Sequence, residues 1–236
     1  MARPQVIINM AMTADGKTAS ATREYPRFTS PADRSRMERL RAGVDAILVG
    51  AETVRAIDPP LHLRDPELQA ERRQAGKPTG LIHVVLSASG RVPPSCKALM
   101  EPSARARILA TSEAAGAGAD GFGPAVQVWV LGPERVDLEE LLQRLSTLGV
   151  DRLLVEGGAD TNGAFLDRDL VDELHLTIAP TLLGGRSAPQ VVGGRGLTMA
   201  CRRPLELLGL DREGDELFCH YRVLRPAPIR GTGQGG

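Results

Sequence analysis

The chain has 236 residues, of which 42% are hydrophobic and 3% aromatic, and its 29 basic and 29 acidic side chains give a formal net charge of zero. Zero net charge and few aromatic side chains argue against nucleic-acid binding and against binding to an anionic membrane surface. The three cysteines are widely spaced, cysteine and histidine show no metal-ligand spacing, and no apolar run reaches the ~18 residues of a membrane span. We therefore expect a cytoplasmic protein without metal, disulfides or membrane segments.

The first predicted elements are a strand and a helix. Residues 6–8 form a short β-branched run, which is typical of a buried strand. Ser30 and Pro31 suit the N-cap and the first position of a helix, so we expect a helix over residues 31–42. Residues 50–65 are polar and interrupted by prolines, and no regular element is predicted there.

The rest of the chain alternates short apolar runs with helical patterns. The clearest helix covers residues 137–148, where Asp137 is the expected N-cap, leucines repeat at helical spacing and Gly149 ends the element. Further strands are predicted at residues 44–49, 81–86, 107–110, 126–131, 152–155 and 174–178, further helices at 66–80 and 159–167, and a closing antiparallel hairpin at 205–210 and 216–224.

This alternation predicts an α/β fold with a mostly parallel central sheet and helices on both faces. No repeat and no central linker divides the chain, so we expect a single domain over residues 1–225. Residues 226–236, PAPIRGTGQGG, have nothing to bury and are predicted to be a disordered tail.

Two glycine-rich segments are candidates for binding a phosphate. Gly116, Gly118 and Gly121 match GxGxxG, but an alternating strand pattern follows where a dinucleotide site needs a helix, so we reject this match. In LLVEGGADTNGAFL, residues 153–166, a buried strand ends at Glu156, two glycines turn the chain and a helix begins at once. The helix N-terminus favours an anion, although a plain strand–helix turn fits this segment about equally well. Glu156, at the carboxyl end of a parallel strand, favours the ligand site.

Other loops supply weaker candidates. Asp15 and Gly16 indicate a turn, and such turns are usually structural. Thr53 and Arg64 lie in the segment after a predicted strand, where ligand contacts are common. Arg41, on the first helix, and Arg64 together would offer two guanidinium groups to one phosphate.

Taken in order, six segments resemble the reductase domain of riboflavin biosynthesis, a family with a dihydrofolate-reductase-like fold. They are INMAMTADGKTA, FTSPADRSRMERLRAGVDAILVGAETV, DPPLHLR, VVLSASGRVP, LLVEGGADTNGAFL and VDELHLTIAPTLLGG, and they cover most of residues 5–195. The resemblance implies a homodimeric enzyme that uses NADPH to reduce a ribosylamino-pyrimidine 5′-phosphate to its ribitylamino product, by hydride transfer to C1′ of the ring-opened imine.

The resemblance also implies roles for individual residues. The expected NADPH contacts are Ala11, Thr53, Ser87, Gly157, Gly158, Ala159 and Thr161. The expected substrate contacts are Asn9, Arg41, Leu61, Arg64 and Glu156, with the phosphate held by Arg41, Arg64 and the backbone of Leu61. Glu156 and Asp15 are the expected groups for proton transfer. Arg91 is the candidate for the cofactor 2′-phosphate.

Some positions depart from the family pattern. Ile57 stands where relatives often carry an aspartate, and Tyr25 and Arg27 replace a common serine and tryptophan, which puts substrate identity in question. Asn9 is typical of stand-alone family members that act on the diamino-pyrimidinone before deamination, so we expect that substrate over the deaminated uracil form. Two other functions remain open: a pteridine- or folate-type reductase on the same scaffold, and a non-catalytic nucleotide-binding relative.

Overall fold

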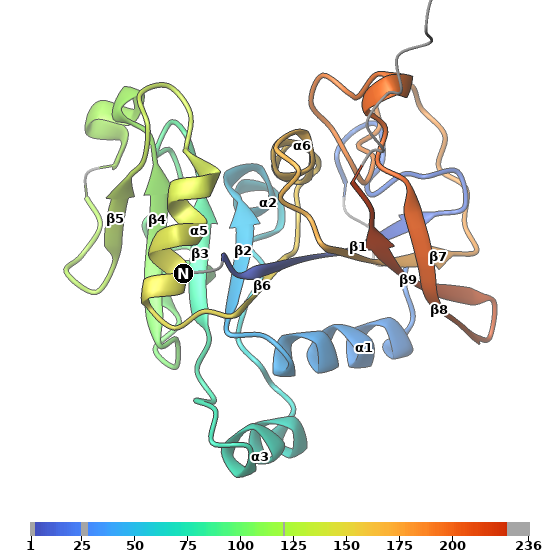
Figure 1. Cartoon of the computed structure of the whole chain (residues 1–236), viewed down its shortest axis with the longest axis horizontal. Helices are drawn as coiled ribbons and strands as arrows, with labels where there is room; N and C mark the ends of the chain where they lie inside the picture. The colour runs from blue at the N-terminus through green and yellow to red at the C-terminus, as the bar shows by residue number, and fades with distance from the viewer. Residues whose placement is uncertain (1–2, 25–27, 120, 226–236) are drawn as a thin grey trace, which may run out of the picture.

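The computed structural model describes residues 3–24, 28–119 and 121–225 and is built around one nine-stranded sheet (Figure 1). The strands are β1 Gln5–Thr13, β2 Ala46–Gly50, β3 Ile82–Leu86, β4 Ala106–Thr111, β5 Gln127–Val130, β6 Arg152–Val155, β7 Glu173–Ala179, β8 Leu205–Glu213 and β9 Glu216–Val223. They lie in the order β5-β4-β3-β2-β6-β1-β7-β9-β8.

Six α-helices and two 3₁₀ segments connect these strands within the described residues. The helices are α1 Pro31–Ala42, α2 Ala51–Ile57, α3 Pro66–Gln74, α4 Lys97–Met100, α5 Leu138–Thr147 and α6 Ala159–Asp167, and the 3₁₀ segments are η1 Glu113–Ala119 and η2 Met199–Cys201. In this part of the chain, no helix is long and apolar enough to cross a membrane.

The sheet topology confirms the predicted fold class. Every neighbouring pair from β5 through to β7 is parallel, as connections through helices require. Strand β9 pairs antiparallel with both β7 and β8, which confirms the closing hairpin. The predicted tail, residues 226–236, lies outside the described residues.

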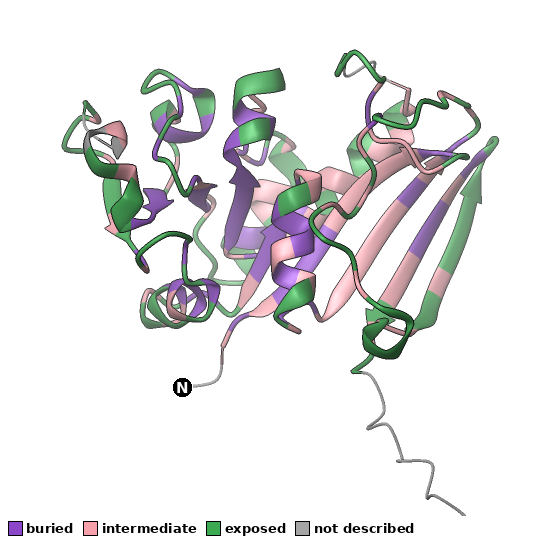
Figure 2. Cartoon of the chain, turned by 90° about the horizontal axis from the view of Figure 1, so that it is seen from above, coloured by how far each residue is buried: buried purple, intermediate pink, exposed green. Residues whose placement is uncertain are grey.

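Helices cover both faces of the sheet and form two apolar cores. On one face, leucines of α5 and Phe165 of α6 pack against inward residues such as Ile8 and Leu48. On the other face, Val54 of α2 and Leu99 of α4 pack against the alternate residues of the same strands. Figure 2 shows the buried residues concentrated in the central strands, with exposure rising toward the β8–β9 hairpin. This two-sided burial explains why the central strands read as continuous apolar runs.

Helix α1 begins at the predicted cap and is anchored to the hairpin. The Ser30 hydroxyl accepts a hydrogen bond from the Ala32 N–H. Ser30 also donates its N–H and its hydroxyl to the Glu216 carboxylate on β9, at 2.7 and 2.5 Å. These bonds fix the N-terminus of α1 over β7 and β9, which places the side chains of its first turn beside the carboxyl half of β1.

The structure differs from the prediction most at α2, where no element was expected. The helix starts at Gly50, which gives no side-chain cap, and it ends at Asp58 in a left-handed conformation (φ 41°) just before two prolines. The local sequence of this seven-residue helix carries weak helix signals. Its stability therefore comes from burial of Val54 against the sheet. Strand β1 is also longer than the predicted run, and the expected helix over 66–80 ends at Gln74.

The different lengths of β1 and β6 create an opening at the carboxyl edge of the sheet. Strand β6 ends at Val155, which pairs with Ile8, whereas β1 continues to Thr13 and pairs there with β7 alone. The chain leaves β6 through Glu156 into α6, and β2 leads directly into α2 on the other side (Figure 1). Residues 9–11 therefore form the floor of an open region between α1, α2 and α6.

Candidate active site

The turn between β6 and α6 brings two helix N-termini together at this edge. Gly157 adopts φ +87°, and its carbonyl oxygen accepts a hydrogen bond of 2.8 Å from the Gly50 N–H at the start of α2. A Cβ on Gly50 would overlap Thr161 Oγ1, and one on Gly158 would lie 3.1 Å from Thr53 Oγ1. Glycine at these two positions therefore lets the turn, α2 and α6 lie this close together.

A cavity of about 780 Å³ opens beside this turn. Its lining includes Gly50–Thr53, Leu86–Ser89, Gly158–Thr161 and Ser187–Gln190. Ser87 is almost completely buried, and within the described ranges its hydroxyl has no hydrogen-bond partner. A space of this volume with an unpaired hydroxyl and a helix N-terminus fits a dinucleotide, since a pyrophosphate would accept hydrogen bonds from the free N–H groups of α6.

A second cavity, of about 430 Å³, continues from the turn toward α1. It is lined by residues of β1 (Met10, Ala11), α1 (Asp33, Arg34, Met37), α2 (Thr53, Ile57), and by Thr18, Phe28, Thr29, Arg64, Pro189 and the Glu156–Ala159 turn. Thr53 and the Gly158–Ala159 segment line both cavities, so the two spaces meet at the α6 N-terminus. A ligand in the first cavity would therefore lie against a ligand in the second.

Glu156 and Arg41 form a buried, bidentate ion pair at the wall of the second cavity. Arg41 Nε and Nη2 donate to the two Glu156 oxygens at 2.8 and 2.7 Å, and Nη1 donates to the His62 carbonyl oxygen at 3.1 Å. Burial lowers the pKa of Arg41, but the charge and hydrogen bonds of Glu156 outweigh it, so the pKa lies above its ordinary value. The sequence prediction assigns the Arg41 guanidinium to a substrate phosphate; in the structure it holds Glu156 in place.

Of the other three predicted substrate contacts, only Arg64 lines the second cavity. Arg64 lines the second cavity with its side chain, while its backbone N–H donates to Glu38 at 2.7 Å. Asn9 lines a neighbouring part of the same region, together with Arg41 and Glu156. The Leu61 side chain is fully buried in the core and lines neither of the two cavities, so only its backbone remains available for the predicted contact.

Asp15 does not have the place that the sequence suggested for a catalytic group. Its carboxylate accepts hydrogen bonds from Thr13 Oγ1 at 2.6 Å and from the backbone N–H groups of Leu183 and Gly184, at 3.1 and 2.6 Å. These bonds, that from Thr13 first, lower the pKa of Asp15 to about 2. Asp15 is exposed and lines neither cavity; it ties the end of β1 to the loop after β7.

Asp33 is a cavity residue that the sequence reasoning missed. It lies in the first turn of α1, lines the second cavity, and accepts a hydrogen bond of 2.6 Å from Thr177 Oγ1. Burial raises the pKa of Asp33 above its usual range, against the opposing hydrogen bonds from Thr177 and Thr29. The sequence gives no functional signal for Asp33, because acidic residues are common in the first turn of a helix for reasons of helix stability alone.

The remaining predicted positions have separate outcomes. Ile57, which stands where relatives often carry an aspartate, lines the second cavity, where a difference in side chain can affect substrate contact. Tyr25 and Arg27 lie outside the described residues. Arg91 is not among the residues that line the larger cavity, whereas Arg23, Arg55 and Arg195 are. Gly116 and Gly118 of the rejected GxGxxG match lie in η1, and the next regular element is β5 rather than a helix, as the sequence indicated.

Comparison with known proteins identifies relatives over nearly the whole chain. The model of the RibD C-terminal domain family matches residues 4–216. The chain is 36% identical over 200 residues to the 2,5-diamino-6-ribosylamino-4(3H)-pyrimidinone 5′-phosphate reductase of Archaeoglobus fulgidus, covering 85% of this chain and 91% of the relative. It is 37% identical over 223 residues to the protein of that name from Methanothermobacter thermautotrophicus, covering 94% and 99%.

Solved structures agree on the fold. A pyrimidine reductase-like protein from Corynebacterium diphtheriae superposes with a TM-score of 0.78 at 21% identity, covering 94% of this chain and 92% of that one. The Thermotoga maritima deaminase/reductase gives a TM-score of 0.76 at 22% identity, over 94% of this chain and 57% of that one. With a family model that spans residues 4–216 and relatives above 35% identity along nearly their full length, the chain belongs to the RibD C-terminal domain family of riboflavin biosynthesis.

Proposed function

We propose that this protein is an NADPH-dependent reductase that converts 2,5-diamino-6-ribosylamino-4(3H)-pyrimidinone 5′-phosphate to its ribitylamino product. The observation that carries this proposal is the meeting of the two cavities at the α6 N-terminus, with Thr53 lining both and the Glu156–Arg41 pair beyond. Such an arrangement positions two anionic ligands against each other, which is the main requirement for a direct hydride transfer.

The larger cavity is assigned to the cofactor. The pyrophosphate would accept the N–H groups at the start of α6, while Thr161 and the unpaired Ser87 hydroxyl offer further donors. The choice of NADPH over NADH is supported by Arg23, Arg55 and Arg195, since guanidinium groups suit a 2′-phosphate. When bound, the reduced nicotinamide supplies the hydride.

A substitution at Gly50 tests this assignment. Gly50→Ala should weaken NADPH binding by about tenfold or more, because the new methyl group would overlap Thr161 Oγ1 and displace the turn. Calorimetric titration with NADPH measures the change. Gly123→Ala is the matched control, since a Cβ there meets nothing within 4 Å. Equal affinity in the two variants would remove the turn from the cofactor site.

The second cavity is assigned to the substrate. Arg64 supplies a guanidinium group for the substrate phosphate, and Glu156, held by Arg41, offers carboxylate oxygens to the sugar hydroxyls or the pyrimidine. In the proposed reaction the ribosylamine opens to an imine, C1′ accepts the hydride and the imine nitrogen accepts a proton, which leaves an open-chain ribitylamine. Because the Asp15 carboxyl lies outside the cavity with a pKa of about 2, the proton is proposed to come from water or by way of Glu156.

Asp33 supports the diamino-pyrimidinone as the substrate. That ring carries two adjacent donors, the 2-amino group and N3–H, which match the two acceptor oxygens of a carboxylate. The deaminated ring has a carbonyl at position 2, which a carboxylate would repel. The archaeal relatives at 36 and 37% identity are named for the diamino substrate, in agreement with this choice and with the reading of Asn9.

Reduction of the two ribosylamino-pyrimidine phosphates in parallel assays tests the proposal. Loss of reduced-nicotinamide absorbance should be faster with the diamino compound than with the deaminated one. If NADPH binds and neither compound is reduced, the proposal fails, and a dihydropterin becomes the substrate to assay. If the uracil form is preferred, the reductase stands but the role of Asp33 is wrong.

Arg64→Ala should raise the KM for the pyrimidine phosphate by about 10- to 100-fold, because a charge-assisted hydrogen bond contributes about 1.5–3 kcal/mol. NADPH affinity should stay within about twofold, since Arg64 lines the second cavity and not the larger one. Steady-state kinetics and NADPH titration give both values, with Arg73→Ala on the exposed side of α3 as control. An equal loss of both affinities would contradict the phosphate assignment.

A homodimer is proposed from the hairpin surface. Leu205, Leu207 and Leu210 pair with alternate residues of β9, because a bulge between Leu207 and Gly209 keeps them on one face, and they are 45, 52 and 55% exposed. A row of exposed leucines on an edge strand is typical of a protein interface, and a second copy of the chain would cover it.

Light scattering should give twice the mass of one 236-residue chain. Leu207→Asp should shift the protein toward the monomer, since it would bury a carboxylate in an apolar interface. Leu182→Asp, at another strongly exposed leucine, should leave the mass unchanged. A monomeric mass for the unaltered protein would refute the dimer.

A further inference from the structure

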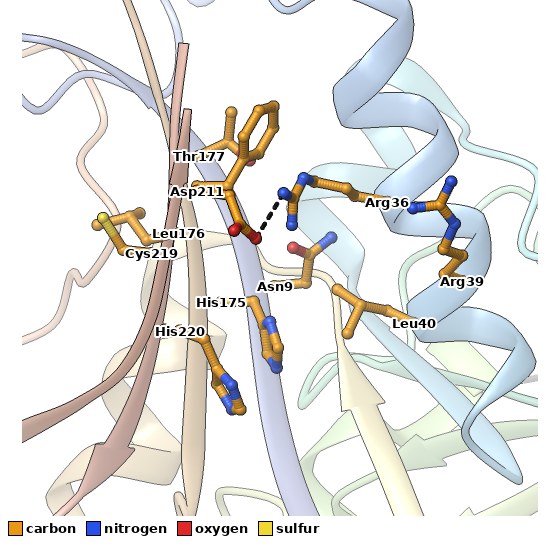
Figure 3. Close-up of a pocket in the computed structure, with 12 residues that line it drawn as sticks. Asn9, Arg36, Arg39, Leu40, His175, Leu176, Thr177, Asp211, Cys219 and His220 are labelled. Atoms are coloured by element: carbon orange, nitrogen blue, oxygen red, sulfur yellow. Dashed lines mark hydrogen bonds and ion pairs between the residues drawn. The ribbon is translucent and has the colours of Figure 1, made fainter. Parts of the chain in front are cut away.

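A cavity of about 290 Å³ lies between α1 and strands β1, β7 and β9. Figure 3 shows Asn9, His175 and His220 on the side of the strands that carries α1, while Leu176 and Cys219 lie on the opposite side. At its far end the cavity is bounded by the ion pair of Arg36 with Asp211, at 2.7 Å. The proposed reductase reaction uses neither histidine.

The two histidines share one carboxylate. Glu173 and His175 are separated by one residue on β7, so their side chains lie on the same face, and His220 is the Cα partner of His175 on β9. Glu173 Oε2 is 3.1 Å from His220 Nε2 and 3.7 Å from His175 Nε2. One donor atom from each of the three residues lies within 4.8 Å of the others.

Neighbouring side chains fix the carboxylate so that one oxygen faces the histidines. The Gln5 amide nitrogen donates to Glu173 Oε1 at 2.8 Å, and Arg152 Nε in turn donates to the Gln5 amide oxygen at 3.0 Å. Glu173 Oε2 is thereby directed to the imidazoles. Hydrogen bonds that orient the ligands in this way are typical of protein metal sites.

We propose that Glu173, His175 and His220 form a three-ligand site for a divalent transition-metal ion of the Zn²⁺ class. Ligands about 2.0–2.2 Å from a tetrahedral zinc lie about 3.3–3.5 Å apart, and the two distances to Glu173 Oε2 bracket that range. Two histidines and one carboxylate are a ligand set that holds Zn²⁺ with one position open, and both histidines line the cavity.

The two histidines are close enough together to bind one ion, but their rings must first change orientation. Their rings are stacked, with centroids 4.0 Å apart and planes at 16°, so their nitrogen lone pairs lie in nearly parallel planes. Binding requires the rings to tilt until both Nε2 atoms converge on the ion.

The site borders the proposed substrate cavity. Asn9, the Cα partner of His175 on β1, lines both the cavity beside the histidines and the region that contains Glu156 and Arg41. A metal held at His175 would therefore lie one strand from the predicted substrate contact Asn9. Metal binding itself does not depend on the proposed reductase activity.

Titration of the full chain with Co²⁺ tests the site. We expect one ion per chain, with the intense visible absorption of a four-coordinate Co²⁺. His175→Asn, His220→Asn and Glu173→Gln should each weaken binding at least about tenfold, and Gln5→Leu should weaken it by about 10–100-fold through loss of carboxylate orientation. His62→Asn is the control, since His62 contacts a single carboxylate, that of Glu101 at 2.8 Å.

A second measurement requires no variant. In the unaltered protein, Zn²⁺ should shift the imidazole resonances of His175 and His220 together, saturating at one ion per chain, and leave those of His83 unchanged because that ring is buried against Ala98. If the two histidine variants bind Co²⁺ as tightly as the unaltered chain, or if Zn²⁺ leaves both resonances in place, the metal site is refuted. NADPH oxidation measured in parallel separates this result from a failure of the proposed reductase.

Discussion

Asp33→Asn should reverse the preference between the two pyrimidine substrates. The carboxylate accepts from the 2-amino group and N3–H of the diamino ring, whereas an asparagine accepts from N3–H and donates to the 2-carbonyl of the deaminated ring. Sites built to hydrogen-bond one group discriminate strongly against its replacement, so the ratio of kcat/KM values should move by about 10²-fold or more toward the uracil form.

The design separates recognition from general damage. Asparagine keeps an oxygen that can accept the 2.6 Å hydrogen bond from Thr177, so α1 should stay in place. NADPH affinity should be unchanged, and Asp215→Asn, an equivalent substitution in the exposed β8–β9 turn, should alter neither rate. A uniform loss of kcat/KM for both substrates would show that Asp33 supports the cavity wall and does not recognise the pyrimidine ring.

Arg41→Met should strongly destabilise the folded protein. It leaves the Glu156 carboxylate, which is about 10% exposed, without the two hydrogen bonds at 2.7 and 2.8 Å that compensate its burial. Removing one member of a buried pair typically costs about 3–5 kcal/mol, which denaturant unfolding would measure as a lower midpoint. Turnover should fall at least about tenfold, because Glu156 loses its fixed position beside the substrate.

Three comparisons make this result specific. Arg39→Met, at an exposed position of the same helix, should change stability by less than about 0.5 kcal/mol. Arg41→Lys keeps the charge but cannot form the bidentate contact, so its stability should lie between those of Arg41→Met and the unaltered protein. The double variant Arg41→Met, Glu156→Gln is the third comparison. If it is as stable as the unaltered protein, the ion pair positions the Glu156 carboxylate and does not stabilise the fold, and the loss of turnover should remain.

The cavity beside the proposed metal site and the region that contains Glu156 and Arg41 share Asn9, so the two sites can be tested in one preparation. An ion at His175 and His220 would add positive charge one strand away from a cavity proposed to bind a phosphate ester. The charge of that ion and the guanidinium of Arg64 act in the same direction on an anionic ligand. Measuring the KM of the substrate with and without Zn²⁺ would therefore show whether the two sites communicate.

Local patterns along the chain were sufficient for most of the sheet. The apolar runs of β2, β3 and β6, the leucine stripe of α5 and the Ser30–Pro31 start of α1 each carry their own signal, because burial on both faces or on one stripe demands those residue types locally. The Glu156–Gly157–Gly158 turn was also recognisable, since a glycine pair between a strand and a helix requires no distant information.

The tertiary structure decided the features whose partners are remote in sequence. Helix α2 is held by packing of Val54 on the sheet and not by its own propensity, so its seven residues gave too little signal. Arg41 and Glu156 are 115 positions apart, and their pairing depends on how α1 crosses the end of β6. Asp33, and the cluster of Glu173 with two histidines, likewise acquire meaning only when helix and strands are brought together. Residue type gives the chemistry that a side chain can perform, and the fold alone determines which side chains perform it jointly.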